Sequence, residues 1–207
     1  STLMRSSAAS DVYKRQIWVL AFANFFVYIV RYAVLDWGPT LLGEWKGISI
    51  QHAGWMVAAF EISGILGMLT AGWATDRFFG GRGPRVCVLC MALATVFIAL
   101  FWGLQEPSMW LATCLLGAAG FCIYGPQALV GIAAANIATK KAAATAVGFT
   151  GLFGYASTLV SGWGLGLLAQ HYGWDVAVGA LILIAVVGTL IFMAAWTAKA
   201  NGYDEGN

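Results

Sequence analysis

Residues 86–104, VCVLCMALATVFIALFWGL, form an uninterrupted run without a charged side chain. A helix needs about 20 mostly apolar residues to cross the roughly 30 Å hydrocarbon core of a bilayer. This run therefore predicts a membrane span. Five further apolar runs of sufficient length lie at about 17–42, 52–74, 109–138, 142–169 and 174–198. The sequence predicts an all-α membrane protein with six transmembrane helices joined by short loops.

The composition of the whole chain agrees with a membrane location. Hydrophobic residues make up 60% of the 207 residues and charged residues 10%, and the mean hydropathy is +0.79. Soluble domains have about 45–50% and about 25%, respectively. The formal net charge is only +2 and the basic residues form no stripe, which argues against a nucleic-acid partner. The lipid bilayer is the expected environment.

The residue types that usually carry catalysis or bind metals are scattered. The cysteines Cys87, Cys90, Cys114 and Cys122 all lie in apolar runs, and no histidine or second CxxC pair accompanies the first two. Packing as small apolar side chains is the favoured interpretation. The two histidines, His52 and His171, lie near loop edges without a nucleophile or acid partner. We therefore expect no enzyme activity, no cofactor and no metal site.

Basic residues outside the spans are distributed unequally between the two ends of the predicted bundle. One end has Lys14, Arg15, Arg77, Arg82, Arg85, Lys140, Lys141 and Lys199, whereas the other has only Lys46. Loops on the cytoplasmic side of a membrane are enriched in lysine and arginine. Both chain ends, including a tail at 199–207, are expected in the cytoplasm, and the protein is expected to be a multi-pass protein of the inner (plasma) membrane.

The first sixteen residues, STLMRSSAASDVYKRQ, differ from the rest of the chain. They are polar, and their apolar residues follow no helical or strand period. We expect residues 1–16 to be a leader outside the bundle, either a cloning-adapter remnant or a fragment of a cytoplasmic loop.

Two charged residues lie near the middle of predicted spans. Arg31 is close to the midpoint of the first span and Glu61 is close to that of the second. An arginine at the bilayer centre costs at least about 2.5 to 3.5 kcal/mol, so it should face protein or water. One interpretation is a structural ion pair. The other is that both residues line a central aqueous cavity, where the guanidinium would bind a phosphate or carboxylate.

Two tyrosines within later spans are further candidates. Tyr124 precedes Gly125 and Pro126, and the proline removes a helical hydrogen bond. Tyr155 follows a run of glycines in the fifth span. Lone tyrosines in membrane helices are more often packing residues than ligand-binding ones. From the residues alone, packing is the favoured role for both.

The loop at 72–85, GWATDRFFGGRGPR, resembles the signature loop found between the second and third helices of each half of major facilitator superfamily proteins. The matching residues are Gly72, Asp76, Arg77, Arg82 and Arg85. In that superfamily the loop is cytoplasmic, in agreement with the orientation predicted from charge. The spacing here is stretched around Gly80 and Gly81.

Three further segments resemble one family within that superfamily, the organophosphate:phosphate antiporters. Residues 24–40, NFFVYIVRYAVLDWGPT, are similar to the family's seventh helix. Residues 124–135, YGPQALVGIAAA, resemble its tenth helix, and residues 140–155, KKAAATAVGFTGLFGY, resemble the start of its eleventh. The resemblance extends over 17–198. It implies that the chain is the C-terminal half of a twelve-helix transporter whose partner is a missing N-terminal six-helix half.

The resemblance also implies a function and a binding site. Members of the family exchange a phosphorylated small molecule, such as glycerol 3-phosphate or a hexose phosphate, for inorganic phosphate. Arg31 matches the seventh-helix arginine that binds the phosphate, and Glu61 matches a glutamate of the eighth helix that takes part in charge switching. The family's polar cavity positions fall on Tyr28, Asp36, Tyr124 and Tyr155.

The identity of the organophosphate stays open. Hexose-phosphate transporters can carry an acidic and a basic residue where this chain has Val147 and Thr150, which favours a glycerol-phosphate transporter. The segment PQALVGIAAA favours hexose-phosphate transporters and their sensor relatives instead. The alternative function is a transporter-like membrane sensor that binds sugar phosphate and signals to a histidine kinase.

Overall fold

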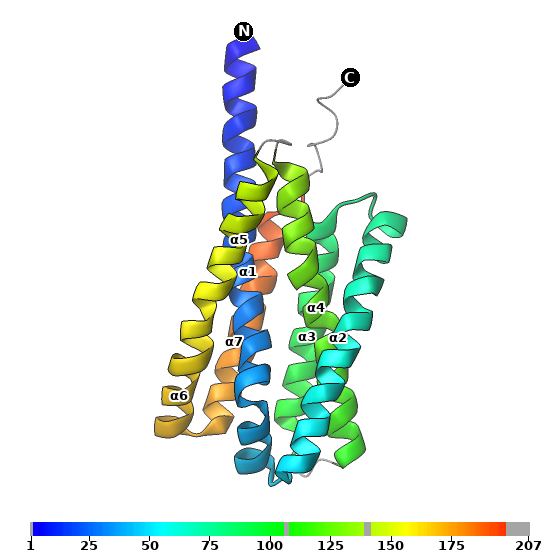
Figure 1. Ribbon diagram of the computed structural model, residues 1–207, viewed down its shortest axis with the longest axis vertical. Coiled ribbons are helices and arrows are strands. Elements are labelled where there is room, and N and C mark those ends of the chain that lie inside the picture. The colour runs from blue at the N-terminus through cyan, green and yellow to red at the C-terminus, as the bar shows by residue number, and fades with distance from the viewer. Residues whose placement is uncertain (1, 106–107, 139–141, 198–207) are drawn as a thin grey trace.

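A computed structural model of the protein describes residues 2–105, 108–138 and 142–197, with side chains from Tyr13 onward. The described chain folds into a bundle of long, nearly parallel helices (Figure 1). Their bounds are α1 (Thr2–Lys46), α2 (Ile50–Phe78), α3 (Gly83–Gly103), α4 (Met109–Ile137), α5 (Ala143–Leu159), a π-helical turn η1 (Val160–Gly164), α6 (Leu165–Tyr172) and α7 (Trp174–Ala194). Since α5, η1 and α6 follow one another as a single span, the described residues contain six helices that are long and apolar enough to cross a membrane. The predicted fold class is confirmed.

The helix connections alternate between the two ends of the bundle. Figure 1 shows the start of α1 and the connection from α2 to α3 at one end of the bundle. The last residues of α4 and of α7 lie at this same end. The connections from α1 to α2 and from α6 to α7 lie at the opposite end. Lys14, Arg15 and the arginines of residues 77–85 therefore share one end of the bundle. Lys140, Lys141, Lys199 and the predicted tail at 199–207 lie outside the described residues.

The first helix is longer than the first predicted span. It begins at Thr2 and continues without interruption into the membrane segment, so residues 2–16 are helical. This stretch contains no glycine or proline, and helix-breaking residues are what would have ended the helix before the span. The other helix ends lie within a few residues of the predicted span limits.

Glycines allow α2 and α4 to pack backbone against backbone. A Cβ atom built on Gly67 would lie 1.9 Å from the carbonyl oxygen of Phe121, and one on Gly120 would lie 2.4 Å from that of Phe60. Real Cβ contacts with backbone are not this short. Small residues of this kind commonly permit close helix approach in membranes. The result is an interlocked pair of helices, and α2 packs chiefly against α4.

A single π-helical turn interrupts the fifth span next to α1. Such a turn displaces carbonyl groups from the regular α-helical pattern. The indole Nε1 of Trp37 donates to the carbonyl oxygens of Ser161, at 3.0 Å, and Gly162, at 3.1 Å. The indole fits because residue 166 is glycine, where a Cβ atom would lie 2.7 Å from Cζ2 of Trp37. Trp37 thus ties α1 to the π-helical turn.

We expect Trp37→Phe to lower the thermal stability of the protein in detergent by a few degrees. The change removes the donor to the π-helical carbonyls, and a net hydrogen bond contributes about 0.5 to 1.5 kcal/mol. Trp163→Phe is the matched control, because Trp163 is in the same turn but is 75% exposed. Equal unfolding midpoints for the two variants would show that the Trp37 hydrogen bonds add nothing to stability.

Candidate functional site

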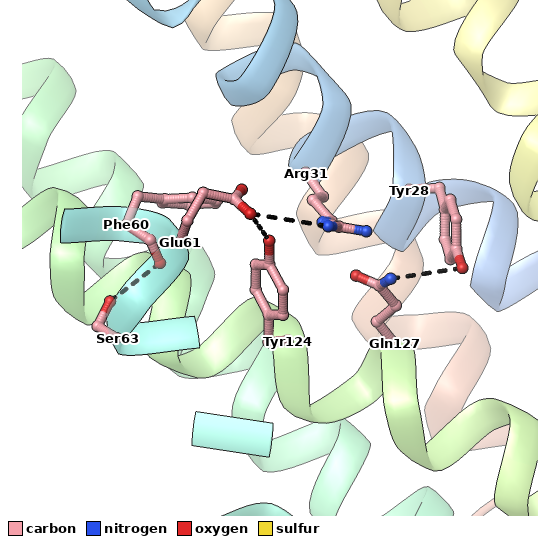
Figure 2. A network of polar contacts seen from close by, with 7 residues as sticks. All are labelled: Tyr28, Arg31, Phe60, Glu61, Ser63, Tyr124 and Gln127. Carbon is pink, nitrogen blue, oxygen red and sulfur yellow. Dashed lines mark hydrogen bonds and ion pairs between the residues drawn. The ribbon is translucent and has the colours of Figure 1, made fainter. Parts of the chain in front are cut away.

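Arg31 on α1 and Glu61 on α2 face each other in the middle of the bundle. The distance between Nη2 of Arg31 and Oε2 of Glu61 is 3.8 Å (Figure 2). This separation is within ion-pair range but longer than a hydrogen bond between the two groups. The side chains are 16% and 31% exposed, respectively. The two mid-span charges therefore form a loose ion pair that is still partly exposed.

Tyr124 brings a third helix to the ion pair. Its hydroxyl group donates to Oε2 of Glu61, and its ring lies 4.5 Å from Cζ of Arg31. A guanidinium over an aromatic face is stabilised by the ring quadrupole. The tyrosine ring has room because residue 64 of α2 is glycine, and a Cβ there would come within 2.3 Å of the ring. Tyr124 thus positions both charged groups.

A second group of contacts lies beside the ion pair. Nε2 of Gln127 donates to the hydroxyl of Tyr28 at 3.4 Å (Figure 2). The ring of Tyr28 contacts the rings of Tyr32 and Tyr155, with centroids 5.6 and 5.9 Å apart. Residues three apart share a helix face, so Tyr28 accompanies Arg31 on α1 and Gln127 accompanies Tyr124 on α4. Two polar helix faces therefore oppose each other.

Several polar atoms in this region lack a hydrogen-bond partner although they are buried. They are Nε of Arg31, Oε1 of Glu61 and Oε1 of Gln127. Buried polar atoms in folded proteins are nearly always paired, so an unpaired group needs an explanation. Figure 2 shows Glu61 and Gln127 on either side of the Arg31 guanidinium, so the unpaired donor and the two unpaired acceptors belong to neighbouring parts of one site. Such a cluster can bind a ligand that carries both acceptor and donor groups.

The remaining predicted site residues differ in their relation to this cluster. Tyr155 joins it through its ring, although the side chain is 63% exposed. Asp36 is exposed on α1 and makes no hydrogen bond or ion pair among the described residues. It follows Arg31 by five residues, which is about 140° around a helix with 3.6 residues per turn. Asp36 therefore points to a different side of α1 than Arg31.

The residues of the signature loop lie at the basic end of the bundle, where α2 connects to α3. Gly72, Asp76 and Gly81 line a cavity of about 140 Å³ together with Asn136 of α4. Gly80 and Gly81 have φ angles of 57° and 77°, which explains why the stretched loop contains glycine at both positions. Arg77 and Arg82 flank this turn.

Arg85 links the signature loop to the end of the last helix. Its Nε donates to the carbonyl oxygen of Trp196 at 3.1 Å, and its guanidinium lies 5.2 Å from the ring centroid of the same residue. The loop region is thus separate from the Arg31 cluster.

Gln127 is the cluster residue that the sequence did not single out. It lies within the segment that resembles the family's tenth helix, but no role was predicted for it. A usable signal was present, because an amide in an apolar span is unusual and Gln127 follows Tyr124 by one helical turn.

Comparisons with known proteins agree with this architecture. The sequence profile of the Major Facilitator Superfamily matches residues 20–205. The probable hexose phosphate transport protein of Chlamydia muridarum is 42% identical over 185 residues, which cover 88% of this chain and 40% of the relative. The glycerol-3-phosphate transporter of Haemophilus influenzae is 37% identical, with 89% of this chain and 43% of the relative covered. The membrane sensor protein UhpC of Escherichia coli is 36% identical, with 82% and 38% covered.

These relatives are transporters and a sensor rather than enzymes. The chain spans about two fifths of the length of the curated relatives it matches. Six spanning helices over that fraction are what one half of a major facilitator fold requires. The chain therefore belongs to the major facilitator superfamily, as a six-helix half of a member of its organophosphate:phosphate antiporter family.

Proposed function

We propose that the protein containing this chain exchanges an organophosphate for inorganic phosphate across the inner membrane, and that Arg31 binds the phosphate group. The observation that carries the proposal is a mid-span guanidinium that is partly exposed and has an unpaired Nε. An arginine presents a planar fork of donors that fits two phosphate oxygens. The relatives of this chain include proteins named for glycerol 3-phosphate and hexose phosphate transport.

The contacts of Arg31 suit reversible binding. Glu61 balances the charge of Arg31 at 3.8 Å, but Oε2 of Glu61 accepts its hydrogen bond from Tyr124. An incoming phosphate can therefore take the Arg31 donors without first breaking an Arg31–Glu61 hydrogen bond. When the phosphate leaves, Glu61 again neutralises the guanidinium. This charge switching avoids leaving an arginine without a counter-charge inside the membrane.

The other half of the protein supplies the rest of the site in this proposal. The missing N-terminal six-helix half carries a second arginine, and phosphate bridges the two halves at the midplane. The halves then rock about the substrate in alternating access. Both chain ends and the signature loop face the cytoplasm in this proposal, because the sequence assigns nearly all basic loop residues to that side.

Counterflow in vesicles tests the proposal directly. The complete protein is reconstituted into liposomes loaded with unlabelled phosphate, and uptake of labelled inorganic phosphate is measured with glycerol 3-phosphate and glucose 6-phosphate as competitors. We expect rapid exchange that at least one competitor inhibits. A sensor would bind a sugar phosphate in a titration but show negligible counterflow. That result would replace the transport proposal with the sensor.

Glu61→Gln should separate binding from turnover. The variant removes the negative charge that competes with phosphate for Arg31, so we expect roughly three- to tenfold tighter phosphate binding. Exchange should become slower at saturating phosphate, because release would leave Arg31 without its counter-charge. Binding is measured by titration and turnover by counterflow. Weaker binding in this variant would contradict the charge-switching role of Glu61.

A further inference from the structure

We propose that Gln127 determines substrate specificity by hydrogen-bonding a hydroxyl group on the organic part of the substrate. This inference rests on the proposed function, because it assigns a second subsite next to the phosphate bound by Arg31. Gln127 would thus distinguish hydroxylated phosphate esters from inorganic phosphate and from alkyl phosphates.

The position of Gln127 supports a role next to the anion. Figure 2 shows its amide projecting from α4 toward the region between Arg31 and Tyr28 of α1. Gln127 follows Tyr124 by three residues, which is about 4.5 Å along a helix. The Tyr124 ring itself lies 4.5 Å from Cζ of Arg31. Gln127 therefore lies about one helical turn beyond the residue that contacts Arg31, next to where the organic part of a phosphate ester on Arg31 would lie.

The direction of the organic part follows from the helix directions. Tyr28 precedes Arg31 on α1, and Gln127 follows Tyr124 on α4. Because α1 begins and α4 ends at the same end of the bundle, both residues are displaced from the ion pair toward that end. Their hydrogen bond confirms that they meet there. The subsite for the organic part therefore lies on the side of Arg31 that faces the basic end.

The hydrogen bonding of Gln127 is incomplete. Oε1 is buried without a partner, and the bond from Nε2 to Tyr28 is long at 3.4 Å. An unpaired buried acceptor costs about 1 to 3 kcal/mol, so a ligand that satisfies it gains affinity. The phosphate group of an ester dianion has only acceptor oxygens and would be repelled by Oε1. A hydroxyl group can donate to Oε1 and can also accept from Nε2.

The opposing polar face offers a compatible second contact. The hydroxyl of Tyr28 can accept from or donate to the same ligand when the long bond to Gln127 opens. Tyr155 places an aromatic ring beside Tyr28, and its side chain is largely exposed. Aromatic surface of this kind suits the C–H face of a polyol. The side chains of Gln127, Tyr28 and Tyr155 therefore fit a hydroxylated carbon chain or ring.

A pair of ligands with the same carbon skeleton tests the inference. Glycerol 3-phosphate and propyl phosphate compete with labelled inorganic phosphate for exchange by the complete protein. We expect the wild type to prefer glycerol 3-phosphate, and we expect Gln127→Leu to reduce this preference about tenfold, because leucine keeps the size but loses the amide. If the site takes only hexose-sized ligands, glucose 6-phosphate and cyclohexylmethyl phosphate replace the pair.

Gln51→Leu is the matched control. Gln51 is exposed in the first turn of α2, far along the helix from Glu61, and this variant should retain the wild-type preference. If Gln127→Leu does not reach the membrane, Gln127→Asn provides the test, because it keeps the amide on a shorter side chain and should also weaken the preference. The elution profile of each purified variant in size-exclusion chromatography in detergent reports whether it is folded.

Three results would overturn the inference. The preference could be unchanged in the Gln127 variants. The affinities for inorganic phosphate, glycerol 3-phosphate and propyl phosphate could fall by the same factor, in which case Gln127 helps to bind phosphate. Wild type could lack any preference for the hydroxylated ligand. If the wild type shows no counterflow at all, the transport proposal fails, and the same ligand pairs are then compared by titration of the purified protein, where the tenfold change is still expected.

Discussion

Phosphate exchange by the complete protein should fall by about one to two orders of magnitude when Arg31 is replaced with lysine. Lysine keeps the positive charge but offers a single ammonium instead of a planar fork. The substitution also loses the stacking of the guanidinium on Tyr124. Hydrogen bonds to charged groups contribute about 1.5 to 3 kcal/mol each, which corresponds to this loss. Counterflow of labelled phosphate in proteoliposomes measures it.

Arg15→Lys is the control for this experiment. Arg15 is on the same helix but is exposed near its basic end. Exchange by this variant should match the wild type. Full exchange by Arg31→Lys would mean that a point charge at this position is sufficient, and the two-donor binding of phosphate by Arg31 would then be wrong.

Gly67→Ala should have the largest effect on the fold. The added Cβ would lie 1.9 Å from the carbonyl oxygen of Phe121 and 2.8 Å from its Cα, and neither backbone atom can move without shifting α4. Overpacking of well-packed sites typically costs about 1 to 3 kcal/mol and sometimes more. We therefore expect a strong loss of membrane-integrated protein and a lower unfolding midpoint in detergent.

Gly54→Ala, on the same helix, is the control and should not lower stability. A Cβ atom at Gly54 has no neighbour within 4 Å. Alanine is also the better helix former, by about 0.5 to 1 kcal/mol. This variant should be as stable as the wild type or slightly more stable. If both alanine variants behaved alike, close packing of α2 on α4 would not control stability.

The helices were predictable because a chain that crosses a bilayer of known thickness must satisfy its backbone hydrogen bonds internally. The apolar run at 86–104 identified α3 to within a few residues. The π-helical turn was not predictable, because two of its carbonyl oxygens accept hydrogen bonds from Trp37, which is more than 120 residues away in the sequence. The helical form of residues 2–16 was also missed, because polar composition does not prevent a helix that lacks glycine and proline.

The site was predictable in part. Arg31 and Glu61 stood out because charges are expensive in the middle of a span. Their approach to each other is a finding of the structure. The family resemblance placed Asp36 among the cavity positions, yet five residues of helix turn that side chain away from Arg31. Gln127 was overlooked because a neutral amide carries a smaller penalty than a charge, and its value depends on its position opposite Tyr28.

The glycine contacts between α2 and α4 have a mechanical consequence. The carbonyl oxygen of Phe121 on α4 packs against Gly67, and that of Phe60 on α2 packs against Gly120. These two contacts prevent α2 and α4 from sliding along each other unless the helices first move apart. Glu61 and Tyr124 both belong to this locked pair, whereas Arg31 belongs to α1. Any shear between α1 and the locked pair must therefore change the gap between guanidinium and carboxylate. The distance between these two groups therefore reports movement of α1 relative to α2 and α4.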